Sequence, residues 1–457
     1  MSIKLRLTIL NFLELFVFGA WLISLGGYLG GTLHFEGFQI GKVFTTLGLA
    51  SLVMPAIIGI IADKYLNAQK VLGILHILGA GFMIYLAQTQ DYDTFFWLML
   101  GYLAMYMPTL GLANSVSYSL LTKHDYDVVK VFPSIRVWGT VGFIVAEVAV
   151  GLTDWAKTNE QFYFAAIISL ALGIYSFTLP SIPLSKSNDA TLAERMGLDA
   201  FALFKEYKMA VFFIFATLLG VVLQISNAWA SEFMRSFTAA YPDSFVVNKA
   251  NVFIALSQGS EVLFILTIPY FLKKFGIKTV MIMSMLAWFL RFGLFGIGSP
   301  EGIGVGYLVM SMVVYGAAFD FFNISGSLFV ETETDSKYRS SAQGLFILLT
   351  NGVGAILGGL GSGYIVQRFT THYTKISEFA ERLGISLDNE WLVNELAEMK
   401  KNGVTIVDGV IQNSSLNVVD WASVWGIFAL YALALAVLFA IIFKYKHNPD
   451  KIGEINH

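Results

Sequence analysis

The chain of 457 residues contains no cysteine and unusually little charge. Without cysteine, a disulfide framework, a thiolate zinc cluster and a thiol nucleophile are all excluded. Asp, Glu, Lys and Arg make up 13% of the residues and hydrophobic residues 56%, whereas a soluble protein carries charge at about a quarter of its positions. So few charged side chains cannot cover the surface of a water-soluble particle of this length. The composition therefore predicts a protein whose outer surface faces a lipid bilayer.

The sequence also lacks the motifs of enzymes and ATP-driven pumps. Its six histidines are scattered, so we expect no metal site. A G-x-x-x-x-G-K-[ST] phosphate-binding loop is absent, and no pair of a nucleophile and a base stands out. We therefore expect a chain that is not an enzyme, holds no cofactor and has no nucleic acid partner.

Long apolar runs recur along the chain, and each of about 18 to 24 residues can cross a hydrocarbon core of ~30 Å. They lie near 9–29, 43–62, 71–88, 95–113, 135–153, 162–181, 209–230, 252–272, 280–298, 303–326, 342–366 and 422–443. The first run is too long for the core of a signal peptide. Because the runs are continuous rather than alternating, they favour helices over a barrel. The expected fold is an all-α membrane protein with twelve transmembrane helices in two six-helix bundles.

The distribution of Lys and Arg predicts the orientation of these helices. Basic residues gather on the side of the two termini, and the short loops of the opposite side hold only Lys42, Lys157, Arg235 and Lys249. This asymmetry places both termini in the cytoplasm. The longest cytoplasmic connection, 182–208, then separates an N-terminal bundle (1–181) from a C-terminal bundle (209–457). The basic loops 62–65 and 272–275 occupy equivalent places in the two halves, as in transporters built from repeats.

One segment does not fit a compact permease. Residues 367–420 form an extracytoplasmic insertion of about fifty residues, long by loop statistics. Within it, Ile376–Leu383 and Glu390–Lys400 have helical periodicity with mixed charges. We interpret the insertion as a small amphipathic helical cap, and a substrate gate is the alternative.

Polar residues inside the predicted spans are costly, so they must face a partner or a water-filled cavity. Several of them, with aromatic neighbours, recur at helical spacing on one face of a helix. They are Arg136, Thr140 and Phe143; Gln224 and Asn227; Gln258 and Glu261; and Tyr315 and Phe319. Amides, a carboxylate and aromatic rings together suit a small polar solute with a flat face. The alternative is that these groups only hydrogen-bond helices to one another.

Asp320 is a separate case, because it lies about 140° around its helix from Tyr315. A carboxylate inside a span is a candidate proton carrier. The alternative is a static pair with Arg291 or Arg136. Glu14 and Glu147 are further carboxylates in predicted spans, and the sequence does not reveal their partners.

Four stretches resemble the bacterial nucleoside–proton symporters, a family of the major facilitator superfamily. They are 132–143 (FPSIRVWGTVGF), 223–227 (LQISN), 257–261 (SQGSE) and 315–326 (YGAAFDFFNISG). Residues 59–64 look like a reduced form of that superfamily's motif between helices two and three. The resemblance covers nearly the whole chain except the insertion.

The resemblance implies proton-driven import of purine and pyrimidine nucleosides across the bacterial inner membrane, by alternating access between the two bundles. It places the nucleoside site on Arg136, Thr140, Phe143, Gln224, Asn227, Gln258, Glu261, Tyr315 and Phe319. It places proton coupling on Asp320. A monomer in the bilayer is expected, with the proton as the coupling ion.

Two features depart from the family pattern. The insertion looks larger than the usual connection, and Glu14 stands where a neutral polar residue is expected. Glu14 would then change the substrate range or add a titratable site. Two other functions stay open: symport of a related polar solute such as a sugar or a nucleobase, and a sensor that binds nucleosides without moving them.

Overall fold

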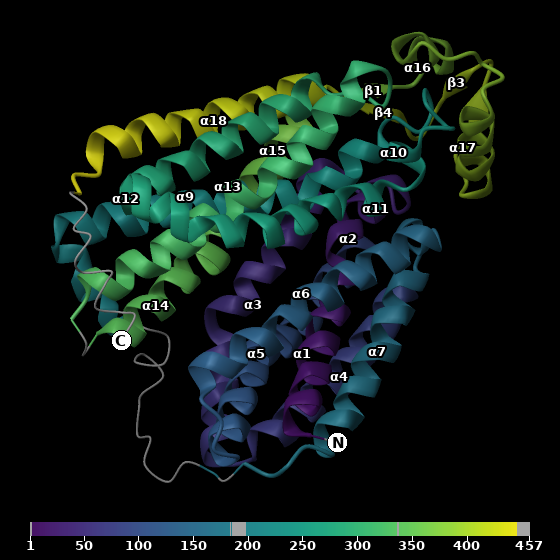
Figure 1. Cartoon of the computed structure of the whole chain (residues 1–457). Coiled ribbons are helices and arrows are strands. Elements are labelled where there is room, and N and C mark those ends of the chain that lie inside the picture. The colour runs from purple at the N-terminus through teal and green to yellow at the C-terminus, as the bar shows by residue number, and fades with distance from the viewer. Residues whose placement is uncertain (1, 183, 185–197, 336–337, 446–457) are drawn as a thin grey trace.

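The computed structural model describes residues 2–182, 184, 198–335 and 338–445, and these residues are mainly helical (Figure 1). The prediction of an all-α membrane protein is confirmed. Eleven helical runs in the described residues are long and apolar enough to cross a membrane. Most of the predicted linker 182–208 lies outside the described residues.

The N-terminal half consists of helices with short connections. Their bounds are α1 Ile3–Gly19, α2 Leu22–Gly31, α3 Gly37–Lys64, α4 Ala68–Ala87, α5 Tyr92–Lys123, α6 Val128–Leu152, the 3-10 turn η1 Trp155–Lys157, and α7 Glu160–Phe177. α1 and α2 together form the first span, which is interrupted at Ala20 and Trp21. Several starts have polar caps: the side chains of Asp91 and Asp127 accept hydrogen bonds from backbone N–H groups of α5 and α6, which satisfies donors that a helix start leaves free.

The C-terminal half contains the remaining spans. Their bounds are η2 Leu198–Lys205, α9 Tyr207–Arg235, α10 Phe245–Asn248, α11 Ala250–Ile254, α12 Leu256–Ile297, α13 Ile303–Glu333, α14 Arg339–Ile347, η3 Leu348–Gly354, α15 Ala355–Arg368 and α18 Trp421–Ile442. The run α14–η3–α15 is one span, and its middle, η3, is π-helical.

α12 accounts for two of the predicted spans. Its 42 residues would reach about 63 Å as a straight helix, twice the hydrocarbon thickness. The run is broken at Gly276, whose φ of 76° and ψ of 165° are non-helical and easily adopted only by glycine. The turn therefore falls at Gly276, and the predicted loop 272–275 is instead the last helical turn before it. With this break the eleven runs become the twelve spans expected from the sequence.

The two halves meet at one end of the molecule and diverge toward the other (Figure 1). At the meeting end α3 packs along α15, and α2 packs against α9. Glycine permits both contacts. A Cβ atom at Gly41 would lie 2.2 Å from the carbonyl oxygen of Gly359, and one at Gly26 would lie 2.0 Å from that of Ala228. No larger residue fits at these two crossings without moving a helix.

Polar contacts join the halves at the same end. Lys249 Nζ lies 2.8 Å from a carboxylate oxygen of Asp154, and Gln367 donates to Glu36 at 2.5 Å. Partial burial raises the pKa of Asp154, but the hydrogen bond and the charge of Lys249 lower it, and the pKa lies below its ordinary value. Because the pKa of Asp154 is lowered, the ion pair with Lys249 is fully formed at any pH above the ordinary pKa of an aspartate. The ion pair is lost only as the pH falls through the lowered pKa of Asp154. This link therefore persists at neutral pH.

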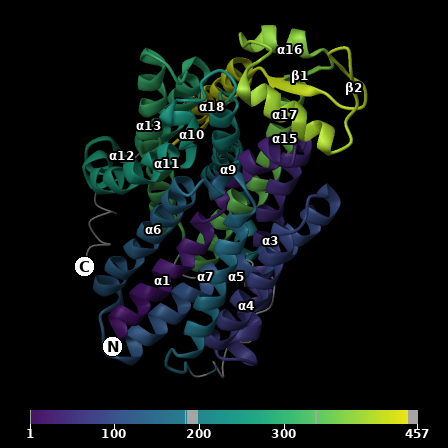
Figure 2. The same ribbon diagram turned by 90° about the vertical axis from the view of Figure 1, so that its right-hand side faces the viewer.

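The insertion forms a small unit, the cap, at the end where the halves meet, opposite the start of α1 (Figure 2). β1 Thr370–Tyr373 pairs antiparallel with β4 Leu416–Val419, and β2 Ile406–Val407 pairs with β3 Val410–Ile411. α16 Ile376–Leu383 and α17 Glu390–Lys401 match the two predicted helices. The four strands were not predicted, so the cap is a mixed unit of helices and strands rather than the helical cap expected from the sequence.

The cap has an apolar core of its own and contacts both halves. Phe379, Leu392 and Leu416 belong to that core. Glu395 of α17 lies 3.8 Å from His34, which follows α2 in the N-terminal half. Asn389 donates to the carbonyl oxygen of Ala239 in the C-terminal half at 3.0 Å. The cap therefore bridges the seam between the halves.

Candidate functional site

The N-terminal half contributes one face of α6 to the predicted site. Arg136, Thr140 and Phe143 are all half-buried, as expected for side chains that border the space between two bundles. Arg136 lies within electrostatic range of Glu261 on α12. This pair is an interaction between opposite charges of the two halves.

The C-terminal half contributes two amides that lack partners. Gln224 on α9 and Gln258 on α12 are buried, and Gln224 Nε2 and Gln258 Oε1 have no hydrogen-bond partner. Asn227 and Glu261, each three residues further along the same helix, are half-buried. A buried polar group without a partner costs about 1–3 kcal/mol, so amides joined only to neighbouring helices would normally be satisfied. These two have hydrogen-bonding capacity left for a ligand.

α13 supplies the aromatic part. The rings of Tyr315 and Phe319 are parallel, 5.8 Å apart with an interplanar angle of 2°. Gly316 lets this helix approach α12 closely: a Cβ atom there would lie 2.6 Å from the carbonyl oxygen of Ser260. Because of that approach, Tyr315 lies within electrostatic range of Glu261.

Asp320 is buried and unpaired. Its Oδ2 atom has no hydrogen-bond partner, and none of the ion pairs in the described part of the chain includes it. Arg291 is held elsewhere, since it donates to the carbonyl oxygen of Ser311 at 2.8 Å and lies 4.6 Å above the Tyr315 ring. The alternative of a static pair with Arg291 or Arg136 is therefore wrong for this structure. Asp320 lies within electrostatic range of Glu261, which carries a charge of the same sign.

The site also contains a residue for which sequence reasoning gave no role. Glu147 is fully buried on α6, and both of its carboxylate oxygens lack partners. It lies four residues after Phe143 and therefore on the same face of α6, and its charge reaches Tyr315. The spacing that selected Arg136, Thr140 and Phe143 could have found it.

Glu14, whose partner the sequence did not reveal, belongs to a network inside the N-terminal half. Its Oε2 atom lies 2.9 Å from His76 Nε2, and Oε1 accepts from the Thr109 hydroxyl at 2.6 Å. The Nδ1 atom of His76 lies 3.1 Å from the Ser169 hydroxyl. Glu14 and His76 are almost fully buried. The carboxylate is thus satisfied within its own bundle.

We expect His76→Ala to lower the free energy of unfolding by about 3–5 kcal/mol, because it removes the partner of the buried Glu14 carboxylate. Thermal unfolding of the purified protein measures this as a lower Tm. His124→Ala is the matched control, since His124 is exposed and should leave the Tm nearly unchanged. Glu14→Gln in the His76→Ala background should recover part of the loss, and an unchanged Tm in His76→Ala itself would show that the pair is not stabilising.

Comparison with known proteins identifies the family. The family described as "Nucleoside H+ symporter" matches residues 1–381. Xanthosine permease of Escherichia coli K12 is 47% identical over 455 residues, which cover 99% of this chain and 98% of the relative. Nucleoside permease NupG of the same organism is 44% identical, with 98% and 97% covered. Both relatives align over their full length, so the expectation that the insertion is larger than usual is wrong for them.

Solved structures agree with the sequence comparison. The crystal structure of nucleoside transporter NupG superposes with a TM-score of 0.82 at 43% identity, covering 98% of this chain and all of that chain. A peptide transporter of the POT family shares the fold alone, with a TM-score of 0.63 at 10% identity, covering 98% of each chain. The chain therefore belongs to the nucleoside H+ symporter family and is a multi-pass, proton-coupled nucleoside symporter with the major facilitator fold rather than an enzyme.

Proposed function

We propose that this symporter imports nucleosides across the bacterial inner membrane and binds them between its two halves. The proposed site comprises Arg136, Thr140, Phe143, Gln224, Asn227, Gln258, Glu261, Tyr315 and Phe319. One observation carries this assignment: α9 and α12 each present an unpartnered buried amide, and Glu261, three residues beyond Gln258, lies within electrostatic range of Arg136 on the other half. A ligand between the halves would satisfy the amides.

The chemistry of each side chain indicates which part of the nucleoside it would contact. A planar base would stack near Phe143 and Phe319, because aromatic faces pack on planar rings. The amides of Gln224 and Gln258 offer both a donor and an acceptor to a base edge. A carboxylate accepts strongly from neighbouring hydroxyls, which suits Glu261 to the ribose, with Arg136 balancing its charge.

We further propose a division into an N-terminal bundle (1–181), a linker (182–208) and a C-terminal bundle (209–457) that carries the insertion 367–420. Contacts at the cap end and divergence at the other end support a conformation open toward the termini. With both termini in the cytoplasm, this is the inward-facing state. Transport then requires the glycine crossings between α2 and α9 and between α3 and α15 to separate, so that the site opens outward.

Asp320 is the proposed proton carrier. A proton taken from outside would neutralise this carboxylate before the halves rock. Moving a neutral group through a low-dielectric setting costs less than moving a charged one. No ion pair among the described residues includes Asp320, which supports the role, because a carboxylate held in a static ion pair would stay charged and would not take up a proton.

The orientation can be measured directly because the chain has no native cysteine. We expect a single cysteine at Glu381, exposed on the cap, to react with a membrane-impermeant maleimide in intact cells. A cysteine at Lys4, exposed on α1, should react only after the cells are opened. The reverse pattern would overturn the proposed sidedness.

We also propose that the protein is a monomer. Light scattering of the purified protein in detergent should then give a protein mass equal to that of one chain.

A further inference from the structure

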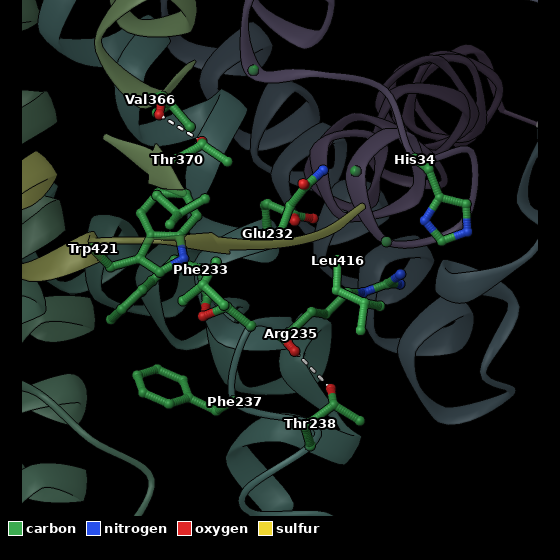
Figure 3. Close-up of a pocket in the computed structure, with 18 of the residues that line it drawn as sticks. His34, Glu232, Phe233, Arg235, Phe237, Thr238, Val366, Thr370, Leu416 and Trp421 are labelled. Carbon is green, nitrogen blue, oxygen red and sulfur yellow. Dashed lines mark hydrogen bonds between the residues drawn. The ribbon is translucent and has the colours of Figure 1, made fainter. Parts of the chain in front are cut away.

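A cavity of about 1050 Å³ lies at the cap end, between the two halves and the cap (Figure 3). Its lining comes from the link after α2, the end of α9, the cap and the start of α18. None of the ten residues assigned above to the nucleoside site and to proton coupling lines it. Its size is at the upper end of ordinary ligand pockets, which measure about 300–1,000 Å³.

Three buried polar atoms of this cavity lack hydrogen-bond partners. They are Oε2 of Glu232 and the indole Nε1 atoms of Trp229 and Trp421, and all three residues line the cavity. Figure 3 shows Glu232 and Trp421 bordering the same space. Buried polar groups are nearly always bonded to protein or to ordered water. One acceptor and two donors left over on one wall are an arrangement that a polar ligand would satisfy.

The same wall offers aromatic surface. The rings of Trp229 and Trp421 are 6.1 Å apart, and Phe233 lies 5.6 Å from Trp421. Arg235, by contrast, is already occupied, because its guanidinium donates to the carbonyl oxygen of Gly27 at 3.0 Å and to that of Ala156. The charge of Arg235 also lies within electrostatic range of Glu232. The atoms left without a hydrogen-bond partner are therefore one carboxylate oxygen and two indole N–H groups, which suit a flat ring that carries hydroxyl groups and ring acceptors.

The position of Glu232 ties the cavity to the seam between the halves. Its carboxyl group lies so close to Gly30 of α2 that a Cβ atom there would be 2.6 Å from Glu232 Cδ. Along α9, Trp229 follows Asn227 by two residues and Glu232 follows it by five, so both lie beyond Ala228, the residue that crosses Gly26. Opening that crossing would connect the cavity with the nucleoside site.

We propose that this cavity is a second nucleoside site, an outer vestibule that holds substrate until the cap end opens. The proposal rests on the proposed function, because it takes the substrate class from there. Glu232 accepts hydrogen bonds from the ribose hydroxyls, the Trp229 and Trp421 indoles donate to the base or sugar, and the rings of Trp421 and Phe233 cover the base. The vestibule fills from the cap side and empties into the space between the halves.

Equilibrium dialysis of the purified full-length protein with radiolabelled uridine tests this. We expect two uridines per chain. Glu232→Gln and Trp421→Leu should each weaken one of the two sites by about tenfold or more, while Glu261→Ala weakens the other. Glu381→Gln is the matched control, since Glu381 is an exposed cap carboxylate that does not line the cavity, and it should leave both sites intact.

The possible results separate this proposal from the proposed function. One site per chain that Glu261→Ala removes and Glu232→Gln leaves unchanged would overturn the vestibule and leave the central site standing. If the unmodified protein binds no uridine, the central nucleoside site is overturned, and the vestibule proposal, which takes its substrate class from that site, is overturned with it. Trp421→Leu keeps the test valid if Glu232→Gln does not fold, and thermal unfolding of each variant identifies that case.

Discussion

Asp320→Asn is expected to abolish uphill accumulation of nucleoside while leaving binding nearly intact. Asparagine has the size of aspartate but cannot take up a proton, so the substrate would still bind and equilibrate but would no longer be coupled to the gradient. For one proton per nucleoside, a gradient of one pH unit stores about 1.4 kcal/mol and supports about tenfold accumulation. In the variant this ratio should fall to one.

Vesicle uptake with an imposed inward proton gradient measures that ratio, and equilibrium binding of uridine reports the site separately. Asp243→Asn is the control, because Asp243 is an exposed carboxylate at the cap end and its loss should leave accumulation unchanged. Accumulation that survives in Asp320→Asn would remove Asp320 from the coupling step. Glu147 would then be the next carboxylate to test, since both of its oxygens are buried without partners.

Glu261→Ala is expected to weaken nucleoside binding by about 10- to 150-fold, and Gln258→Ala by about 2- to 10-fold. A hydrogen bond to a charged group contributes about 1.5–3 kcal/mol and one between neutral groups about 0.5–1.5 kcal/mol. The larger effect of Glu261→Ala has a second cause, because this variant also leaves Arg136 without the opposite charge within its range.

Titration of the purified variants with uridine measures both effects. Glu301→Ala and Gln88→Ala are matched controls, since both side chains are exposed and neither belongs to the proposed site. Normal affinity in both test variants would take these two residues out of the site. Normal affinity in Gln258→Ala alone would show that its amide bonds only to water.

The spans could be predicted from the sequence because a bilayer demands long apolar runs, but their ends could not. α6 begins at Val128, seven residues before the run 135–153, because polar turns continue a helix beyond the hydrocarbon. The basic pair Lys273 and Lys274 marked the turn in α12 to within a few residues. The chain stays helical up to Phe275, and Gly276 alone has non-helical dihedral angles. A single residue with positive φ is therefore enough to turn the chain from one span to the next.

The cap shows a different limit. Its two helices repeat apolar residues every three to four positions over eight and twelve residues, enough for the pattern to stand out. Its strands have only two or four residues each, which is too short for an alternating pattern to be recognised. They are fixed by pairing between segments such as 370–373 and 416–419, which are far apart in the sequence.

For the site, helical spacing selected faces but not partners. The face of Arg136, Thr140 and Phe143 was predicted, whereas the partners of Arg291 and Glu14 required the tertiary structure. Arg291, in the second half of α12, bonds to serines on α9, on the first half of α12 and on α13, and Glu14 bonds to His76, which lies 62 residues away. Such contacts depend on how the helices pack, and spacing along one helix carries no information about them.

Uptake of radiolabelled uridine and adenosine into proteoliposomes, with and without an inward proton gradient, tests the central claim most directly. We expect accumulation above the outside concentration only when the gradient is present, and its collapse when a protonophore is added. Saturable binding with no accumulation under either condition would contradict proton-coupled import by this chain.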